Sequence, residues 1–128
     1  MVQTVKLHKP ACLADTNKLQ AFNRLAEAKS TLMPHEVSTG IGCSLVEAIA
    51  LLLLLYDQGY AEPFLLVYHK DHLDSPVAAR DLVDGFPSLP FICELCDREI
   101  TTRDSLMFDF LFKLESQIIV EYIYDGTI

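Results

Sequence analysis

Two cysteines three positions apart, Cys93 and Cys96, form the clearest chemical motif in the sequence. A Cys-x-x-Cys turn can place two thiolates on one side of a metal ion, and zinc is a metal that such turns bind. A tetrahedral site needs four ligands, so two more must come from elsewhere in the chain. His69 and His72 are spaced so that one turn could present both side chains, and they are candidate ligands beside the two cysteines.

The segment 93–100 resembles one half of a zinc ribbon, in which a tight turn supplies two thiolates and the next strand leads away. The resemblance implies one structural zinc ion. Cys12 and Cys43 are the alternative source of the missing ligands, if the fold brings them to the pair. Two interpretations without bound metal stay open. In one the pair is a redox site, although Glu94, Asp97 and Glu99 oppose thiolate formation there. In the other the cysteines pack as small apolar side chains.

Composition and charge limit the class of protein. The chain has 128 residues, of which 51% are hydrophobic, and this predicts a folded domain with one core and a small appended element. Its formal net charge of −8 repels phosphate backbones and anionic lipid surfaces. The first residues lack the apolar core of a signal peptide, and four unevenly spaced cysteines do not form a secreted disulfide framework. We therefore expect a cytoplasmic protein that does not enter membranes.

The element around which the rest is organised is a nearly unbroken apolar helix over residues 43–60. Only nine residues separate Glu47 from Asp57, well short of the roughly 20 apolar residues that a bilayer crossing needs. At 100° per residue, Leu51 and Leu54 lie on the same face as the helix's polar residues, so the face expected to meet water is itself apolar. A helix of this kind is either buried in the core or covered by a partner.

Other elements follow from hydrophobic periodicity and from the signals that begin or end helices. Residues 108–114 and 118–124 alternate as two strands of a hairpin would, although Leu106, Phe110 and Leu114 also fit one helix face. The remaining expected elements are a short strand at 3–7, a helix from residue 17, a short helix at 34–39, a strand at 61–69, a helix at 75–85 and a compact turn at 93–100.

Over residues 17–72 this order of elements resembles the winged-helix superfamily. The segment 34–37, Pro-His-Glu-Val, and the segment 45–59 are similar to its second and third helices. We therefore expect an α+β fold with a winged-helix-like three-helix core and a wing strand, followed by a short helix and a small antiparallel β element. The expected domains are 1–74, which is winged-helix-like, and 75–128, a β-rich extension with the Cys-x-x-Cys turn that packs on the first.

Winged-helix proteins commonly bind DNA through the third helix and the wing, and the resemblance implies a DNA-binding transcriptional regulator as one function. The residues argue against it. No lysine or arginine occurs between Lys29 and Lys70, so the expected recognition helix carries no arginine to read bases and no lysine to neutralise phosphate. Nucleic-acid binding by this chain alone is therefore not expected.

The function that we expect instead is a non-catalytic protein-interaction role, as an adaptor or accessory subunit of a multiprotein complex or as a homo-oligomer. No nucleophile elbow or phosphate-binding loop occurs, so no enzyme is expected. A zinc-stabilised structural domain is a further alternative. The residues expected to contact a partner are Leu51, Leu54, Tyr56, Tyr60, Phe64 and Tyr68.

Overall fold

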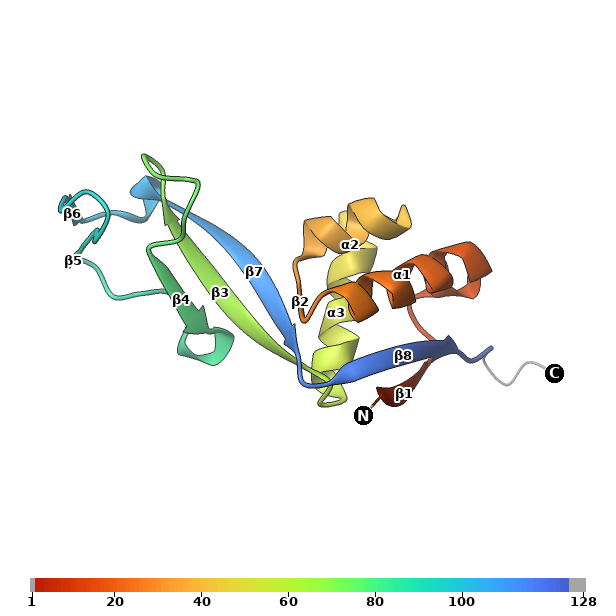
Figure 1. Ribbon diagram of the computed structural model, residues 1–128. Helices are drawn as coiled ribbons and strands as arrows, with labels where there is room; N and C mark the ends of the chain where they lie inside the picture. Colours follow the sequence, from red (N-terminus) through yellow and green to blue (C-terminus); the bar gives the residue numbers. More distant parts are fainter. Residues whose placement is uncertain (1, 125–128) are drawn as a thin grey trace. The chain divides into compact units, whose positions relative to one another are not determined.

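The computed structural model describes residues 2–124, which fall into two compact units (Figure 1). The first unit comprises Met1–Glu62 and Phe112–Ile128, and the second unit comprises Pro63–Leu111. The expected division into 1–74 and 75–128 does not coincide with these borders, because the second unit is an insertion within the sequence of the first. Helices and mainly antiparallel strands make up the described residues, so the expected α+β class is confirmed.

Helix α1, Thr16–Ala28, begins one residue before the expected start at residue 17, and Asp15 caps it. The Asp15 carboxylate accepts hydrogen bonds from the backbone N–H groups of Asn17, at 2.8 Å, and Lys18, at 3.2 Å. These are two of the donors that the first turn of a helix leaves unpaired. The helix buries Phe22 and Ala26 against the core of the first unit.

Helices α2, Pro34–Ile41, and α3, Leu45–Asp57, are separated by a sharp turn. Gly42 has a φ of 75°, a left-handed conformation that ends α2 and that favours glycine. Ser44 then begins α3 with a capping box: its hydroxyl accepts from the Glu47 N–H, and the Glu47 carboxylate accepts from the Ser44 N–H. These bonds hold the pKa of Glu47 below its usual value.

Among the described residues no single helix is long and apolar enough to cross a membrane; α2 and α3 reach that length and composition only together, across a bend of 116°.

The orientation of α3 differs from the expected one. Leu51 is 0% exposed and packs in the core of the first unit, so its predicted place on an outward face is wrong. The outward face instead carries the exposed side chains of Leu45, Val46, Leu53 and Tyr56. The reason lies in the polar residues used to orient the helix: Ser44 and Glu47 are capping residues bound to the helix's own N-terminus, so they do not mark the side that faces water.

The strands form three sheets. In the first, β1 (Val2–Leu7) pairs in parallel with β8 (Gln117–Tyr122). The second has the order β2 (Thr31–Leu32), β7 (Leu106–Leu114), β3 (Ala61–His69) and β4 (Ala78–Asp81). The third is the antiparallel pair of β5 (Phe91–Ile92) and β6 (Glu99–Ile100). The described residues also include three short 3-10 helices: η1 (Ala11–Ala14), η2 (Leu82–Asp84) and η3 (Arg103–Ser105).

Two expected elements are wrong. Residues 75–85 do not form a helix, because β4 pairs antiparallel with β3, Ala78 opposite Val67, and the short η2 follows it. Ser75 is a residue type that often caps a helix, and Pro76 is a type tolerated in a first helical turn, so the sequence favoured a helix here. The pairing with β3 outweighs this local preference. The second error concerns pairing: β7 and β8 are both strands, as expected, but they form no hairpin, since β7 lies between β2 and β3 while β8 pairs with β1.

One side-chain amide binds the edge of β8 that faces away from β1. Asn23 of α1 donates from Nδ2 to the carbonyl of Val120 at 3.0 Å, and its Oδ1 accepts from the Val120 N–H at 2.8 Å. The amide thus makes both bonds that a neighbouring strand would make at this position. Helix α1 therefore contributes hydrogen bonds as well as apolar side chains to the first unit.

Replacing Asn23 by alanine should destabilise the first unit by about 1–3 kcal/mol, because both polar groups of Val120 lose their partner. Urea denaturation followed by far-ultraviolet circular dichroism measures this change. Gln20→Ala, on the exposed part of the same helix, is the matched control and should change stability by less than about 0.5 kcal/mol. Equal stabilities of the two variants would contradict the assigned role of Asn23.

Candidate metal centre

The first pair of candidate ligands lies in a tight turn at the end of β3, residues 69–72, called the histidine turn. His69 is the last residue of the strand, and its carbonyl accepts from the His72 N–H at 2.8 Å. The two residues also form an isolated antiparallel bridge, and their ring centroids are 5.7 Å apart. The turn therefore presents both imidazoles close together, as the sequence spacing suggests.

The second pair lies between β5 and β6, in residues 93–98, called the cysteine turn. The Cys93 carbonyl accepts from the Asp97 N–H at 2.7 Å, and the Cys93 N–H donates to the Arg98 carbonyl at 2.9 Å. Asp97 has a φ of 61°, a left-handed conformation that aspartate tolerates better than most residues. These bonds fold the backbone tightly between the two cysteines and bring both thiols to the same side of the turn.

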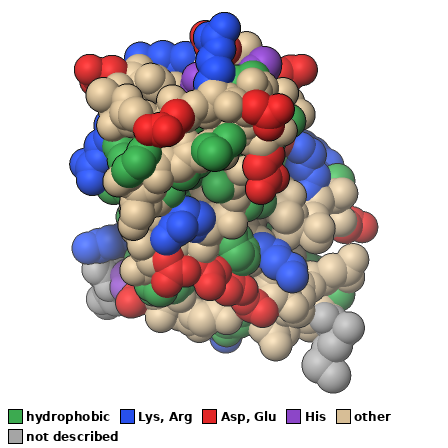
Figure 2. Space-filling model, turned by 90° about the vertical axis from the view of Figure 1, so that its left-hand side faces the viewer, with side chains coloured by type: hydrophobic (Ala, Val, Ile, Leu, Met, Phe, Trp, Pro, Cys, Tyr) green, Lys and Arg blue, Asp and Glu red, His purple; other side chains and the backbone are tan. Residues whose placement is uncertain are grey.

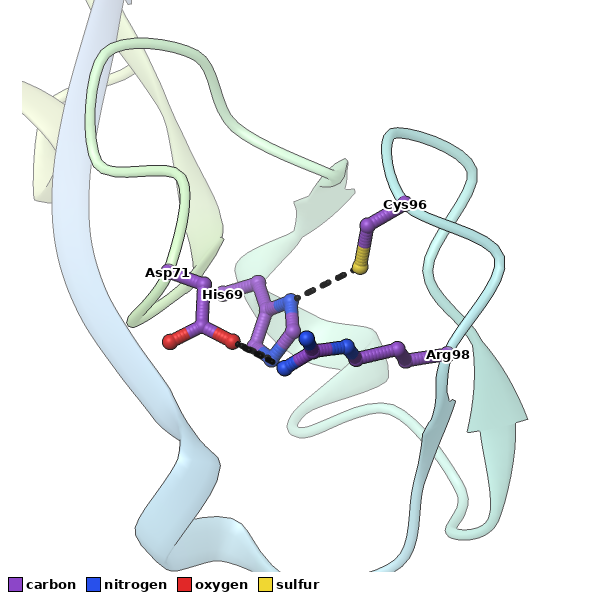
Figure 3. Close-up of polar contacts among 4 residues, drawn as sticks. All are labelled: His69, Asp71, Cys96 and Arg98. Carbon is purple, nitrogen blue, oxygen red and sulfur yellow. Dashed lines mark hydrogen bonds and ion pairs between the residues drawn. The ribbon is translucent and has the colours of Figure 1, made fainter.

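The two turns meet, and their four side chains are positioned to bind a metal ion. One ligand atom from each of His69, His72, Cys93 and Cys96 lies within 4.8 Å of the others. The Nδ1 atom of His69 is 3.5 Å from the Sγ atom of Cys96 (Figure 3). In a tetrahedral site with Zn–S of 2.3 Å and Zn–N of about 2.0–2.1 Å, that separation would be about 3.6 Å. This pair of candidate ligand atoms therefore has the spacing of a metal site.

The site is partly enclosed. Cys93 is 0% exposed and His69 is 6% exposed, while Cys96 and His72 are half-buried. Cys93 also belongs to the apolar cluster of the second unit. The other fully buried members of that cluster are Leu65, Val67, Ile100 and Leu106. The ligands thus lie at the border of a small core, where an ion would be shielded from water on one side.

Two charged side chains adjoin the ligands, and sequence reasoning missed them. Asp71 of the histidine turn accepts from Arg98 of the cysteine turn, Oδ2 to Nη1, at 3.0 Å. The same carboxylate oxygen is 3.6 Å from Nε2 of His69. In the sequence Asp71 is only an acid near a histidine, which is more often a solvated surface pair.

The alternative ligands, Cys12 and Cys43, belong to the core of the first unit and contribute nothing to this group. Burial, with Cys43 and Glu47 nearby, raises the pKa of Cys12 to about 11. Burial also raises the pKa of Cys43. Both thiols are therefore protonated at neutral pH, whereas a metal ligand or a nucleophile is a thiolate.

The residues expected to contact a partner are divided between the two units. Leu51, Leu54, Tyr56 and Tyr60 belong to the first unit, whereas Phe64 and Tyr68 belong to the second. Apart from the buried Leu51, they are half-buried or, in the case of Tyr56, exposed. The most exposed apolar side chain of α3 is Val46, at 76%, which the sequence analysis did not select. Its position next to the helix cap could have identified it, since side chains in a first turn are often solvated.

Charges are mixed on the face of the molecule that Figure 2 shows. Lysine and arginine side chains are scattered among aspartate and glutamate side chains, with small hydrophobic patches between them.

The His2Cys2 group is thus the best-defined chemical feature of residues 2–124. Its four ligands come from two turns of the second unit, and its apolar surroundings come from the adjoining strands. Comparison of the chain with protein-family models, with curated proteins and with solved structures found no match, so its function must be inferred from its own residues.

Proposed function

We propose that this chain is a zinc-binding protein in which the ion is structural and holds the second unit together. The observation that carries the proposal is the convergence of two histidines and two cysteines within 4.8 Å. A set of two sulfur and two nitrogen ligands is typical of tetrahedral zinc. Four protein ligands also complete the coordination of the ion, whereas a catalytic zinc keeps one position open for water or substrate.

The small core of the second unit supports a structural role. Its cluster contains five fully buried apolar residues, and Cys93 is one of them. Units of this size bury little apolar surface and are commonly stabilised by disulfides or by a metal. All four cysteines of the chain are free thiols, so no disulfide holds this unit. An ion would join the histidine turn to the cysteine turn across some twenty intervening residues of the chain.

The purified, untagged protein should bind about one zinc ion per chain, measured by elemental analysis after dialysis. Zinc at 1,000 times its dissociation constant should stabilise the protein by about 4 kcal/mol in urea denaturation. Cys93→Ser should abolish stoichiometric binding, because it removes a buried thiolate ligand. Cys43→Ser, which changes a half-buried thiol of the first unit, is the control and should still bind one ion. The proposal is wrong if wild type supplied with zinc retains none, or if Cys93→Ser binds as tightly.

We also propose that the helices of the first unit, together with the strands β3 and β7, form a winged-helix-like module that binds protein. The support is its order of elements, α1, β2, α2 and α3 followed by β3 and β7, with strand order β2–β7–β3. Residues 70–105, which include both ligand-bearing turns, lie in the chain between β3 and β7. The resemblance implies a wing after the third helix, and the metal-binding segment would then belong to the wing region.

The outward face of α3 favours protein over nucleic acid as the partner. Its exposed residues are Leu45, Val46, Leu53 and Tyr56, and the helix contains no lysine or arginine. Beside them is a shallow groove of about 540 Å³, with mostly apolar walls. The groove is lined by Lys9, Pro10, Ala11, Ala50, Leu53, Leu54 and Asp57. Exposed apolar area of this kind marks protein-binding surfaces, whereas base reading requires arginine, lysine, asparagine or glutamine.

Val46→Glu and Leu53→Glu should each weaken binding to a protein partner or to a second copy by about tenfold or more, because they charge the centre of the apolar face. Light scattering at several concentrations measures self-association, and both variants should keep the circular dichroism spectrum of wild type. Gln20→Glu, an exposed change on α1, is the control. Micromolar binding of wild type to duplex DNA, with a steep salt dependence, would instead favour the DNA-binding alternative.

A further inference from the structure

The histidine turn and the cysteine turn are joined by a chain of polar contacts that begins outside the four ligands, at Arg98 and Asp71, and continues to His69 and Cys96. Arg98 Nη1 donates to Asp71 Oδ2 at 3.0 Å, and this oxygen is 3.6 Å from His69 Nε2. On the opposite side of the same ring, His69 Nδ1 faces Cys96 Sγ at 3.5 Å (Figure 3). One imidazole therefore lies between a ligand thiol and a carboxylate.

The two nitrogens of His69 thus face different partners. A neutral imidazole carries a proton on one nitrogen and a lone pair on the other, and only the lone pair can bind a metal. The nitrogen that faces Cys96 is Nδ1, so the proton must be on Nε2 for the ring to bind a metal on that side. Nε2 is the nitrogen beside the Asp71 carboxylate. Their separation of 3.6 Å is slightly longer than a hydrogen bond, and a small rotation of either side chain would let the carboxylate accept the Nε2–H.

We propose that Asp71 is a positioning residue of the metal centre, an inference that rests on the zinc site proposed above. Its carboxylate accepts the Nε2–H of His69, keeps the proton off Nδ1 and directs the Nδ1 lone pair toward the ion. A hydrogen-bonded carboxylate also makes the imidazole a stronger ligand. Asp71 itself binds no metal, because its carboxylate lies on the far side of the ring and is paired with Arg98.

Arg98 has a smaller part in the same arrangement. Its side chain is 72% exposed and that of Asp71 is 53% exposed, and ion pairs between such exposed groups contribute little. The pair nevertheless fixes the carboxylate on the side where Nε2 lies, and it links the histidine turn to the cysteine turn. The expected order of importance is therefore Asp71 first and Arg98 second.

The test is zinc affinity measured by competition with a chelator of known affinity, at one pH and one salt concentration. Asp71→Asn should bind zinc about 10 to 100 times more weakly than wild type, as for other residues that support metal-binding histidines. Arg98→Gln should weaken binding about two- to fivefold. Asp74→Asn removes the same charge two residues beyond His72, on an exposed side chain, and should stay within about twofold of wild type.

A second measurement separates positioning from a general effect on folding. In the zinc-loaded wild type, nitrogen NMR of the histidine rings should show His69 protonated on Nε2 and bound to zinc through Nδ1. In Asp71→Asn, the Nε2 proton should exchange with water faster, because its carboxylate acceptor is gone. The metal-free forms of wild type and Asp71→Asn should unfold at the same urea concentration if Asp71 acts through the metal.

The outcomes separate the two proposals. If wild type binds no zinc, the structural zinc site and the role of Asp71 both fail. If wild type binds zinc but Asp71→Asn binds it as tightly as Asp74→Asn, the role of Asp71 alone fails. The same conclusion follows if the NMR spectra show Nε2 of His69 bound to the ion.

Discussion

The second unit depends on bringing two thiols and two imidazoles to one point. Sulfhydryl groups are weak hydrogen-bond donors and acceptors, so among themselves these groups gain little from lying within 4.8 Å of each other. A divalent cation changes the energy of the same geometry, because thiolate and imidazole ligands together bind zinc with a large free energy. The hydrogen bonds inside each turn, such as Cys93 to Arg98, set the backbone so that the side chains converge. At the zinc site proposed above, metal binding would therefore add to the stability of this unit.

Local rules predicted the helices of the first unit well. Asp15 and Ser44 begin α1 and α3 as cap residues should, and Gly42 ends α2 in the conformation that glycine adopts most easily. Such signals act within a few residues, so they can be read without the fold. The predicted orientation of α3 was wrong for the same reason. Ser44 and Glu47 were used to find the face exposed to water, but their polar groups bind the N-terminus of the helix.

Features that depend on partners distant in the chain were not predicted. The pairing of β4 with β3 and of β8 with β1 follows from sheet formation, which short-range propensity does not determine. For the metal centre, the spacing of Cys93 and Cys96 sufficed to identify half of the ligands, and the nearby His69 and His72 were named as one possible complement. What the spacing could not give was the contact between Asp71 and Arg98, since it exists only once both turns have met.

The discontinuous course of the first unit has a consequence for synthesis on the ribosome. Strand β1 pairs in parallel with β8, with Val2 opposite Gln117. Val2 therefore has no strand partner until more than a hundred further residues have been synthesised. The second unit is contiguous, and all of its ligands emerge before β8 does. If the site proposed above binds zinc, the ion could therefore be captured before β8 is available to pair with β1.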